Sequence, residues 1–338
     1  MALQSLANSG NTPARASLSA AAGLVLDGEF ELLAPLGSGS HADVFAALQL
    51  SAGGRRVAVK ILSPLYLTLP EGDFRKAATG LRREGELLSG LKSPCFVQMY
   101  GSGTTPDQRP YLAIELAEGP TLGTWLQSGE PPLRHIGEVI RQWAQGLGEM
   151  HRLGWVHRDV SPANSVVTAH GPHGNRLRSY DLGTATQISD RPDRFRVGFD
   201  RDRPAGTPAY MSPEQAIGGV VTGRADQFSL AAITYEALAG RRAVPADLGR
   251  AAMALSFLRG SDDIPVVPLD EVRPDLPEAV CDAIARALER DPAHRFDSIE
   301  DFADEVANGL AAGRGTGAMS LWRRVTHKVS KALNRGNS

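Results

Sequence analysis

The sequence predicts an α+β fold in which a sheet comes first and a mostly helical part follows. Three short apolar segments near the start, at 30–36, 43–50 and 56–63, are rich in Val, Leu and Phe, as strands are. After Gly119 the apolar residues recur with helical spacing instead. Because strands and helices are segregated along the chain rather than alternating, the pattern favours α+β over α/β.

The remaining elements follow in order. The predicted strands span 30–36, 43–50, 56–63, 95–100 and 111–116. The predicted helices span 73–91, 136–153, 223–238, 277–290 and 298–310. The helix at 223–238 is apolar over most of its surface, so we expect it to be buried. Residues 1–28, rich in Ala, Ser and Asn, predict a flexible leader, and 311–338 a linker and basic tail.

The bulk composition excludes several classes of protein. The 338 residues include 42% hydrophobic and 22% charged residues, with a formal net charge of −2. A near-neutral globular chain of this kind argues against nucleic acid as the main partner. Cys95 and Cys281 have no CxxC neighbour, so we expect buried thiols in a reducing compartment. Neither a membrane-spanning run nor a secretory signal is recognised, so a cytoplasmic protein is expected.

A glycine-rich segment between the first two strands is a candidate phosphate-binding loop. Glycines let the main chain approach phosphate oxygens with its N–H groups. By itself the loop is a weak indication of nucleotide binding, and it is not a P-loop, because no Gly-Lys-Ser/Thr follows. The residues of this loop are Leu36, Gly37, Ser38, Gly39, Ser40, His41, Ala42, Asp43 and Val44.

Lys60 strengthens the indication, because it ends an otherwise apolar strand. A lysine that points inward from such a strand is costly unless it meets an anion, such as a polyphosphate, or a carboxylate that holds it. The next helix offers Glu84 and Glu86, which lie about 200° apart around the helix axis. Only one of them can face the lysine, and we expect it to be Glu84, with Glu86 in solvent.

Five motifs occur in order: the glycine-rich loop and residues 57–60, 157–164, 181–183 and 212–214. Through them the chain resembles the eukaryotic-like (Hanks-type) serine/threonine protein kinase family, and bacterial members above all. The resemblance covers about 30–310, most of the chain. It implies a kinase domain over 29–310 with a bilobal fold, a small antiparallel-sheet lobe over about 29–117 and a large, mostly helical lobe over about 118–310.

The resemblance also implies roles for individual residues. Asp159 would be the catalytic residue that accepts the proton of the substrate hydroxyl, and Lys60 would pair with the α- and β-phosphates of ATP. Asn164 and Asp181 would hold Mg²⁺, or Mn²⁺, through oxygen ligands. His157 would be structural. The implied reaction transfers the γ-phosphoryl group of ATP to Ser/Thr hydroxyls of protein substrates, the chain itself included.

The adenine site follows from the same resemblance. Ile114 would be the gatekeeper residue at the back of the site. The main chain of Glu115 and Ala117 would hydrogen-bond the base, and Ala58 and Val44 would pack on its faces.

Three further features resemble those of kinases that act on proteins. Residues 206–214 resemble the substrate-docking end of an activation segment. Asp226 would anchor the main chain of the catalytic loop, and Arg295 would form a buried, structural ion pair with Glu214. Small-molecule phosphotransferases generally lack this set, so the resemblance favours a protein substrate. A pseudokinase that binds nucleotide and partners without transfer is the alternative, although Lys60, Asp159 and Asp181 are all present.

The sequence departs from the family pattern in three places. Ala42 replaces the third loop glycine. Ser161 stands where serine/threonine kinases usually carry Lys, which removes a positive charge near the transferring phosphate and leaves Ser/Thr against Tyr specificity open. Arg158 precedes Asp159, yet 190–206 contains no Ser, Thr or Tyr. We hypothesise that carboxylates within this segment replace phosphate as partners of Arg158.

The tail over 320–335 contains no acidic residue. On a helix its apolar residues would share one face, flanked by basic groups, which fits a peripheral membrane helix on the inner face of the membrane or a partner-binding helix. A helix packed on the large lobe and a solvated tail are the plainer alternatives.

Overall fold

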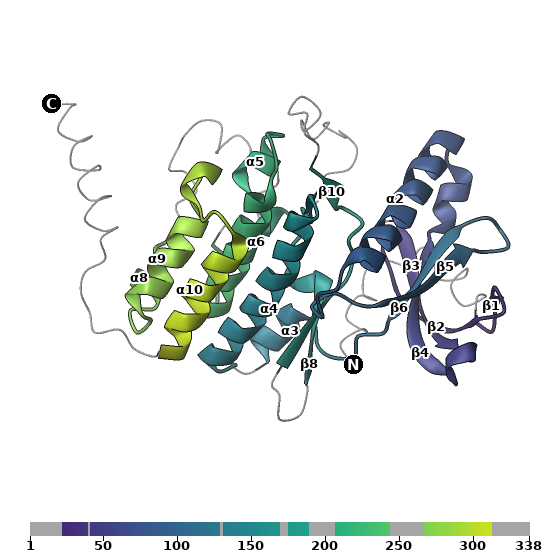
Figure 1. Ribbon diagram of the computed structural model, residues 1–338, viewed down its shortest axis with the longest axis horizontal. Helices are drawn as coiled ribbons and strands as arrows, with labels where there is room; N and C mark the ends of the chain where they lie inside the picture. The colour runs from purple at the N-terminus through teal and green to yellow at the C-terminus, as the bar shows by residue number, and fades with distance from the viewer. Residues whose placement is uncertain are drawn as a thin grey trace. The chain divides into compact units, whose positions relative to one another are not determined.

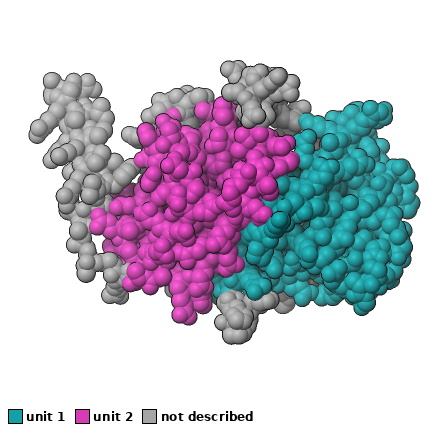
Figure 2. All heavy atoms as spheres, viewed as in Figure 1, with its two compact units in different colours: residues 1–128, 163–185 teal, residues 129–162, 186–338 magenta. Residues whose placement is uncertain are grey.

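The computed structural model describes residues 22–39, 41–128, 131–169, 175–188, 207–243 and 266–312 (Figure 1). The chain divides into two compact units, coloured separately in Figure 2. Unit 1 comprises Met1–Ser128 and Ala163–Ala185, and unit 2 comprises Gly129–Pro162 and Thr186–Ser338. Residues 163–185 therefore group with the sheet, whereas the lobe boundary near residue 117 stays a prediction.

Unit 1 is built on a six-stranded antiparallel sheet with the order β1-β2-β3-β4-β6-β5. The strands are β1 (Val25–Leu26), β2 (Phe30–Ser38), β3 (Ala42–Gln49), β4 (Arg55–Leu62), β5 (Met99–Thr104) and β6 (Pro110–Glu115). Alternate residues of β4, Val57, Val59 and Ile61, share one core with Phe30 and Phe45 of the neighbouring strands, as the two-residue period of a strand requires.

The sheet begins earlier than expected. Strand β1 lies inside the range 1–28 that was predicted to be a flexible leader, and it pairs with β2. Leu26 is buried in the core of the sheet. The composition of residues 1–28 as a whole did not indicate that one of its side chains is part of this core. The predicted leader is therefore wrong for its last residues, and residues 1–21 lie outside the described part of the chain.

The fourth predicted strand, at 95–100, is also misplaced, because β5 begins only at Met99. The apolar residues before it are buried but bind another partner: Ser179 donates its N–H to the Cys95 carbonyl at 2.6 Å and accepts from the Val97 N–H at 3.0 Å. Strand β5 itself contains Gly101 and Gly103. A Cβ atom at Gly103 would lie 2.7 Å from the Tyr111 ring, so close packing, rather than chain flexibility, explains that glycine.

Helix α2 (Glu71–Gly90) follows the short 3₁₀ helix η3 (Pro64–Thr68) and packs on the sheet beside β6. Its buried face carries Leu81, Glu84 and Leu88, while Glu86 is exposed. The helix approaches β6 closely at Gly85, where a Cβ atom would lie 2.7 Å from Leu112 Cδ2. Helical phase and this contact together turn Glu84 inward.

The rest of unit 1 consists of η2 (Leu50–Ala52), α3 (Leu122–Gln127), η4 (Pro162–Asn164) and the antiparallel pair β8 (Ser165–Ala169) and β9 (Asn175–Ser179). Strand β9 ends two residues before Asp181. The register of the pair places Ser165 opposite Ser179.

Unit 2 is mostly helical. Its helices are α4 (Leu133–Arg152), α5 (Pro213–Ala216), α6 (Gly223–Ala239), α8 (Leu269–Val272), α9 (Glu278–Ala287) and α10 (Ile299–Ala312), with η7 (Pro208–Tyr210) and η8 (Pro292–His294) between them. Strands β7 (Trp155–Val156) and β10 (Thr186–Gln187) form a short antiparallel ladder. Helix α6 is buried over most of its surface, as its composition predicted, and α4 packs against both α6 and α10.

The two units confirm the predicted α+β class with an antiparallel sheet and a mostly helical second part. Helix α10 continues to Ala312, two residues into the predicted linker. None of the described helices has the length and apolar content needed to cross a bilayer. The basic tail over 320–335 lies outside the described residues, and its predicted membrane or partner contact stays a prediction.

Candidate active site

Lys60 lies on β4 and meets two carboxylates within unit 1. Its Nζ atom lies 2.8 Å from both carboxylate oxygens of Glu84 and 2.9 Å from Asp181 Oδ1. The side chains of Lys60 and Glu84 are 14% and 3% exposed, whereas that of Asp181 is 47% exposed. The expected partner, Glu84 rather than Glu86, is the one in contact. The Lys60 ammonium is thus bound by the buried carboxylate of Glu84 and by the partly exposed carboxylate of Asp181.

Two carboxylates stabilise the charged form of Lys60. Burial alone would lower the pKa of Lys60, but the carboxylates of Asp181 and Glu84 outweigh it and raise that pKa above its ordinary value. Burial raises the pKa of Glu84, and the nearby Lys60 ammonium opposes that shift. Lys60 is therefore a fixed cation in the neutral pH range, which suits it to a polyphosphate.

The glycine-rich segment forms the turn between β2 and β3. The Gly39 N–H donates to the Ala42 carbonyl at 2.8 Å, and the Ser38 hydroxyl donates to Asp43 Oδ1 at 2.5 Å. The His41 ring stacks on the Tyr66 ring with the centroids 6.0 Å apart. These contacts hold the turn between β2 and β3 in place. Leu36 and Gly37 are half-buried at the end of β2, and Ser40 lies outside the described residues.

The predicted adenine-binding residues line the neighbouring strands. Ala58 of β4 lies directly opposite Ile114 of β6, and both are buried. Val44 of β3 lies opposite Lys60 and is half-buried. The sheet register therefore brings the two proposed packing residues and the proposed gatekeeper onto adjacent strands.

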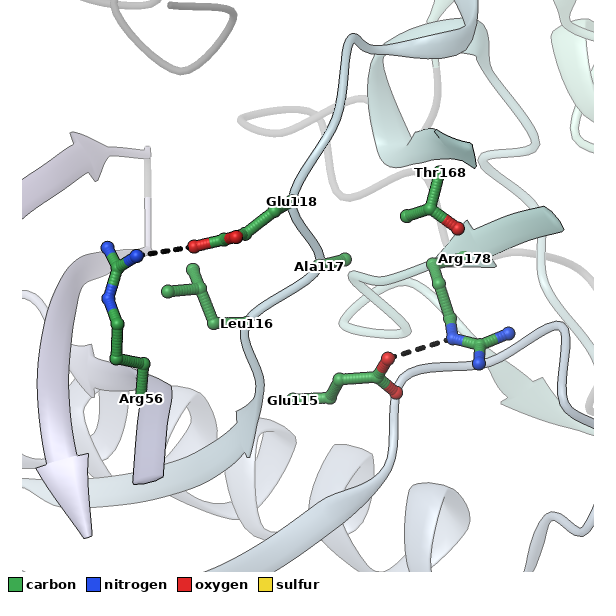
Figure 3. A pocket seen from close by; sticks show the side chains of 7 residues that line it. All are labelled: Arg56, Glu115, Leu116, Ala117, Glu118, Thr168 and Arg178. Atoms are coloured by element: carbon green, nitrogen blue, oxygen red, sulfur yellow. Dashed lines mark hydrogen bonds and ion pairs between the residues drawn. The ribbon is translucent and has the colours of Figure 1, made fainter. Parts of the chain in front are cut away.

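An open pocket of about 390 Å³ lies at residues 115–118, just after β6 (Figure 3). Glu115 pairs with Arg178 Nε at 2.9 Å, and Glu118 pairs with Arg56 Nη1 at 2.5 Å, as the dashed lines in Figure 3 mark. The second carboxylate oxygen of Glu115 accepts the Gln98 N–H at 3.2 Å. Both carboxylates are thus paired within the protein, and the base contacts expected of the Glu115 and Ala117 main chain stay a prediction.

Asn164 directly precedes β8, and Asp181 lies two residues after β9. Both residues therefore lie at the same end of the β8–β9 pair. The Tyr180 N–H donates to the Asn164 carbonyl at 3.0 Å. Asp181 has a φ of 69°, a left-handed conformation that is uncommon outside glycine. The next residue, Leu182, is buried, and its N–H donates to Glu84 Oε1 at 3.3 Å. The apolar Leu182 side chain is thus buried directly after Asp181.

The donor set of Asn164 and Asp181 fits a magnesium ion. One carboxylate and one amide oxygen are hard ligands, and Mg²⁺ is commonly bound through one or two carboxylates together with substrate phosphates and water. The half-exposed Asp181 side chain can be reached from solvent. The described ranges contain no group of three or more His, Cys, Asp and Glu that could hold a metal ion by themselves.

Asp159 lies in unit 2, on a loop held by Asp226 at the start of α6. The carboxylate of Asp226 accepts the His157 N–H at 2.9 Å and the Arg158 N–H at 2.8 Å, and His151 Nε2 lies 2.8 Å away. Burial alone would raise the pKa of Asp226, but the hydrogen bond and charge of His151 outweigh it and hold that pKa below its usual value. The main-chain anchor expected of Asp226 is therefore present.

Thr207 was not assigned a role from the sequence, although it belongs to the 206–214 motif. Its N–H and its hydroxyl both donate to Asp159 Oδ1, at 2.7 and 3.0 Å. A threonine directly before Pro208 in that motif was the available signal. Ser161 is 1% exposed, and its hydroxyl has no hydrogen-bond partner among the described residues. In this structure its side chain faces the interior of the unit.

Glu214 and Arg295 form the expected buried pair in unit 2. Two hydrogen bonds, of 2.8 and 2.9 Å, join the guanidinium to the two carboxylate oxygens. The predicted carboxylate partners of Arg158 within 190–206 lie outside the described residues, and that hypothesis stays a prediction. Within the described part, Arg158 Nη1 donates to the Thr186 hydroxyl at 2.8 Å.

Comparison with known proteins identifies the family. The protein kinase domain family matches residues 30–306, which is most of the chain. The chain belongs to the protein kinase family. The match covers all five motifs named above, and the domain bounds 29–310 stay a prediction.

Several bacterial protein kinases are similar to this one. The chain is 34% identical over 291 residues to the serine/threonine-protein kinase pkn2 of Myxococcus xanthus, and the aligned part is 86% of this chain and 33% of that protein. It is 32% identical over 301 residues to PknA of Mycobacterium tuberculosis, covering 86% and 63%, and 28% identical over 291 residues to PrkC of Bacillus subtilis, covering 86% and 42%. The chain thus spans between one third and two thirds of these relatives.

Proposed function

We propose that this kinase domain transfers the γ-phosphoryl group of ATP to Ser or Thr hydroxyls of protein substrates. The observation that carries the proposal is the Lys60 ammonium, fixed between Glu84 and Asp181. The two carboxylates offset the cost of burying this charge, and the half-exposed Asp181 side chain leaves the ammonium accessible to a polyphosphate from that side. The relatives pkn2 and PknA are named serine/threonine-protein kinases, which supports the proposed substrate class.

The other residues supply what phosphoryl transfer requires, which is mainly positioning and charge neutralisation. Lys60 binds the α- and β-phosphates, and the glycine-rich turn covers the phosphates with main-chain N–H groups. Asn164 and Asp181 hold Mg²⁺, or Mn²⁺, which when bound neutralises charge that develops on the phosphates. The adenine lies between Ala58 and Val44, with its edge toward the main chain of residues 115–117.

Asp159 accepts the proton of the attacking hydroxyl and orients its oxygen. Two features prepare it for that role. Asp226 fixes the main chain on the N-terminal side of Asp159, and Thr207 holds Oδ1.

Transfer of label from [γ-³²P]ATP to a general protein substrate and to the chain itself tests the proposal. The wild type is compared with Asp159→Ala and with Asp304→Ala, which removes an exposed carboxylate on α10. We expect incorporation to fall by about 10²-fold or more for Asp159→Ala and to stay unchanged for Asp304→Ala. Phosphoamino-acid analysis should yield phosphoserine or phosphothreonine. Equal incorporation by the wild type and Asp159→Ala would refute the assignment of Asp159. ATP binding without any incorporation would favour the pseudokinase alternative.

A further inference from the structure

Tyr180, the residue between β9 and Asp181, is bound twice to the segment that carries Asn164. Its main-chain N–H donates to the Asn164 carbonyl at 3.0 Å, and its phenolic O–H donates to the Ala163 carbonyl at 2.6 Å. We infer that Tyr180 is a positioning residue that sets the spacing between Asn164 and Asp181 and so tunes the affinity of the site for Mg²⁺. The inference rests on the proposed function, which assigns the metal to these two residues.

The sheet register shows why this position matters. The β8–β9 pair ends with Ser165 opposite Ser179, so the two proposed ligands lie just beyond the last pair of the ladder. Beyond that point the ladder no longer fixes the distance between the two chains. The two hydrogen bonds of Tyr180 extend the connection by one residue and lead directly into Asp181.

The conformation of Asp181 increases the need for such support. Its φ of 69° lies in the left-handed region, and strained residues persist only where their surroundings hold them in place. Tyr180 fixes the main chain before Asp181, while the Leu182 N–H bond to Glu84 fixes it after. The Asp181 carboxylate is therefore held from both sides along the chain.

The phenol is suited to a permanent hydrogen bond. A phenol is protonated at neutral pH, so the Tyr180 hydroxyl remains a donor to the Ala163 carbonyl. Mg²⁺ demands a nearly ideal octahedral arrangement with short metal–oxygen distances. A small displacement of Asn164 relative to Asp181 therefore weakens Mg²⁺ binding, whereas metal-free nucleotide binding does not depend on that spacing.

Tyr180→Phe removes the hydroxyl alone, and Tyr111→Phe is the matched control. Tyr111 is a buried tyrosine of the same unit whose hydroxyl donates to Asp27 at 2.6 Å, outside the proposed metal and nucleotide sites. Binding of a non-hydrolysable ATP analogue is measured by calorimetry over a Mg²⁺ titration and in EDTA. Occupancy by Mn²⁺ is measured directly by electron paramagnetic resonance with the analogue present.

Loss of one hydrogen bond should raise the Mg²⁺ concentration for half-maximal binding by about two- to tenfold in Tyr180→Phe. Metal-free affinity should stay within about twofold, the Mn²⁺ signal should weaken, and Tyr111→Phe should match the wild type. An unchanged Mg²⁺ dependence in Tyr180→Phe, or an equal loss of metal-free affinity, would overturn the inference. Asp181→Asn distinguishes a failure of the inference about Tyr180 from a failure of the proposed metal site. If this variant also leaves the Mg²⁺ dependence unchanged, the proposed metal site itself is wrong.

Discussion

Arg295 offers a sharp test of what holds unit 2 together, because every N–H of its buried guanidinium has a partner. The side chain is 0% exposed and pairs with Glu214. Besides the two Glu214 oxygens, its acceptors are the carbonyls of Glu289, Arg224 and Arg290 at 2.8, 2.8 and 3.2 Å. Arg295→Met keeps most of the side-chain volume but leaves these carbonyls and a buried carboxylate without their donors.

The expected cost follows from that count. Breaking a buried ion pair by removing one partner costs about 3–5 kcal/mol, and for a unit of this size about 1 kcal/mol lowers the melting temperature by roughly 2–4 °C. Arg295→Met should therefore melt about 6–20 °C below the wild type in differential scanning calorimetry. The matched control is Arg141→Met, since the Arg141–Asp304 pair is partly exposed and should cost less than about 1 kcal/mol.

A second substitution isolates the reason for the loss. In Arg295→Met, the Glu214 carboxylate is left buried without its partner. If this carboxylate causes the loss of stability, adding Glu214→Leu to Arg295→Met should recover part of the melting temperature, because a buried apolar side chain needs no partner. A melting temperature of Arg295→Met within about 2 °C of the wild type would show that the pair contributes little and that the reasoning is wrong.

Two further predictions concern packing and pH. Gly85→Ala places a Cβ atom 2.7 Å from Leu112 Cδ2, so it should shift α2, lower stability by about 1–3 kcal/mol and weaken binding of an ATP analogue. Gly80→Ala on the same helix meets nothing within 4 Å, so calorimetry should find it neutral or stabilised by up to about 1 kcal/mol. The lowered pKa of Asp226 stabilises the fold fully above its ordinary value of 3.8 and less as the pH falls through the folded-state value. The difference in melting temperature between wild type and Asp226→Asn should therefore be full at pH 7 and shrink below about pH 4, and a difference that grows on acidification would contradict this sign.

The sequence predicted best where a local period or a full charge constrains the answer. Helical phase allowed only one of Glu84 and Glu86 to face Lys60, and the expected Glu84 is the one in contact. Charge also explains why the pair of Glu214 and Arg295 could be expected from the family resemblance, since a buried ion must find an opposite ion. These residues carry their chemistry in the side chain, so their type is visible in the sequence.

The sequence predicted worst where the partner is a main-chain group. Every residue has a carbonyl, so nothing in the sequence marks Ala163 as the acceptor for Tyr180 or Cys95 as the acceptor for Ser179. The apolar run at 95–100 was predicted to be a strand of the sheet, because the sequence does not show that Cys95 and Val97 bond to the main chain of Ser179 instead. The two donors that Thr207 gives to Asp159 join residues far apart in the sequence, and only the tertiary structure brings them together.

Arg158 and Asp181 both hold a φ of 69°, which costs a residue with a side chain about 1–2 kcal/mol relative to glycine. A population evolved in the laboratory for heat tolerance alone should therefore drift toward Gly at both positions, and more strongly at Arg158, because Asp tolerates the left-handed region better than Arg does. A population that must also turn over substrate should keep the original residues and find its stability elsewhere. Sequencing the two populations side by side would separate the strain that this chain tolerates for chemistry from the strain that serves no purpose.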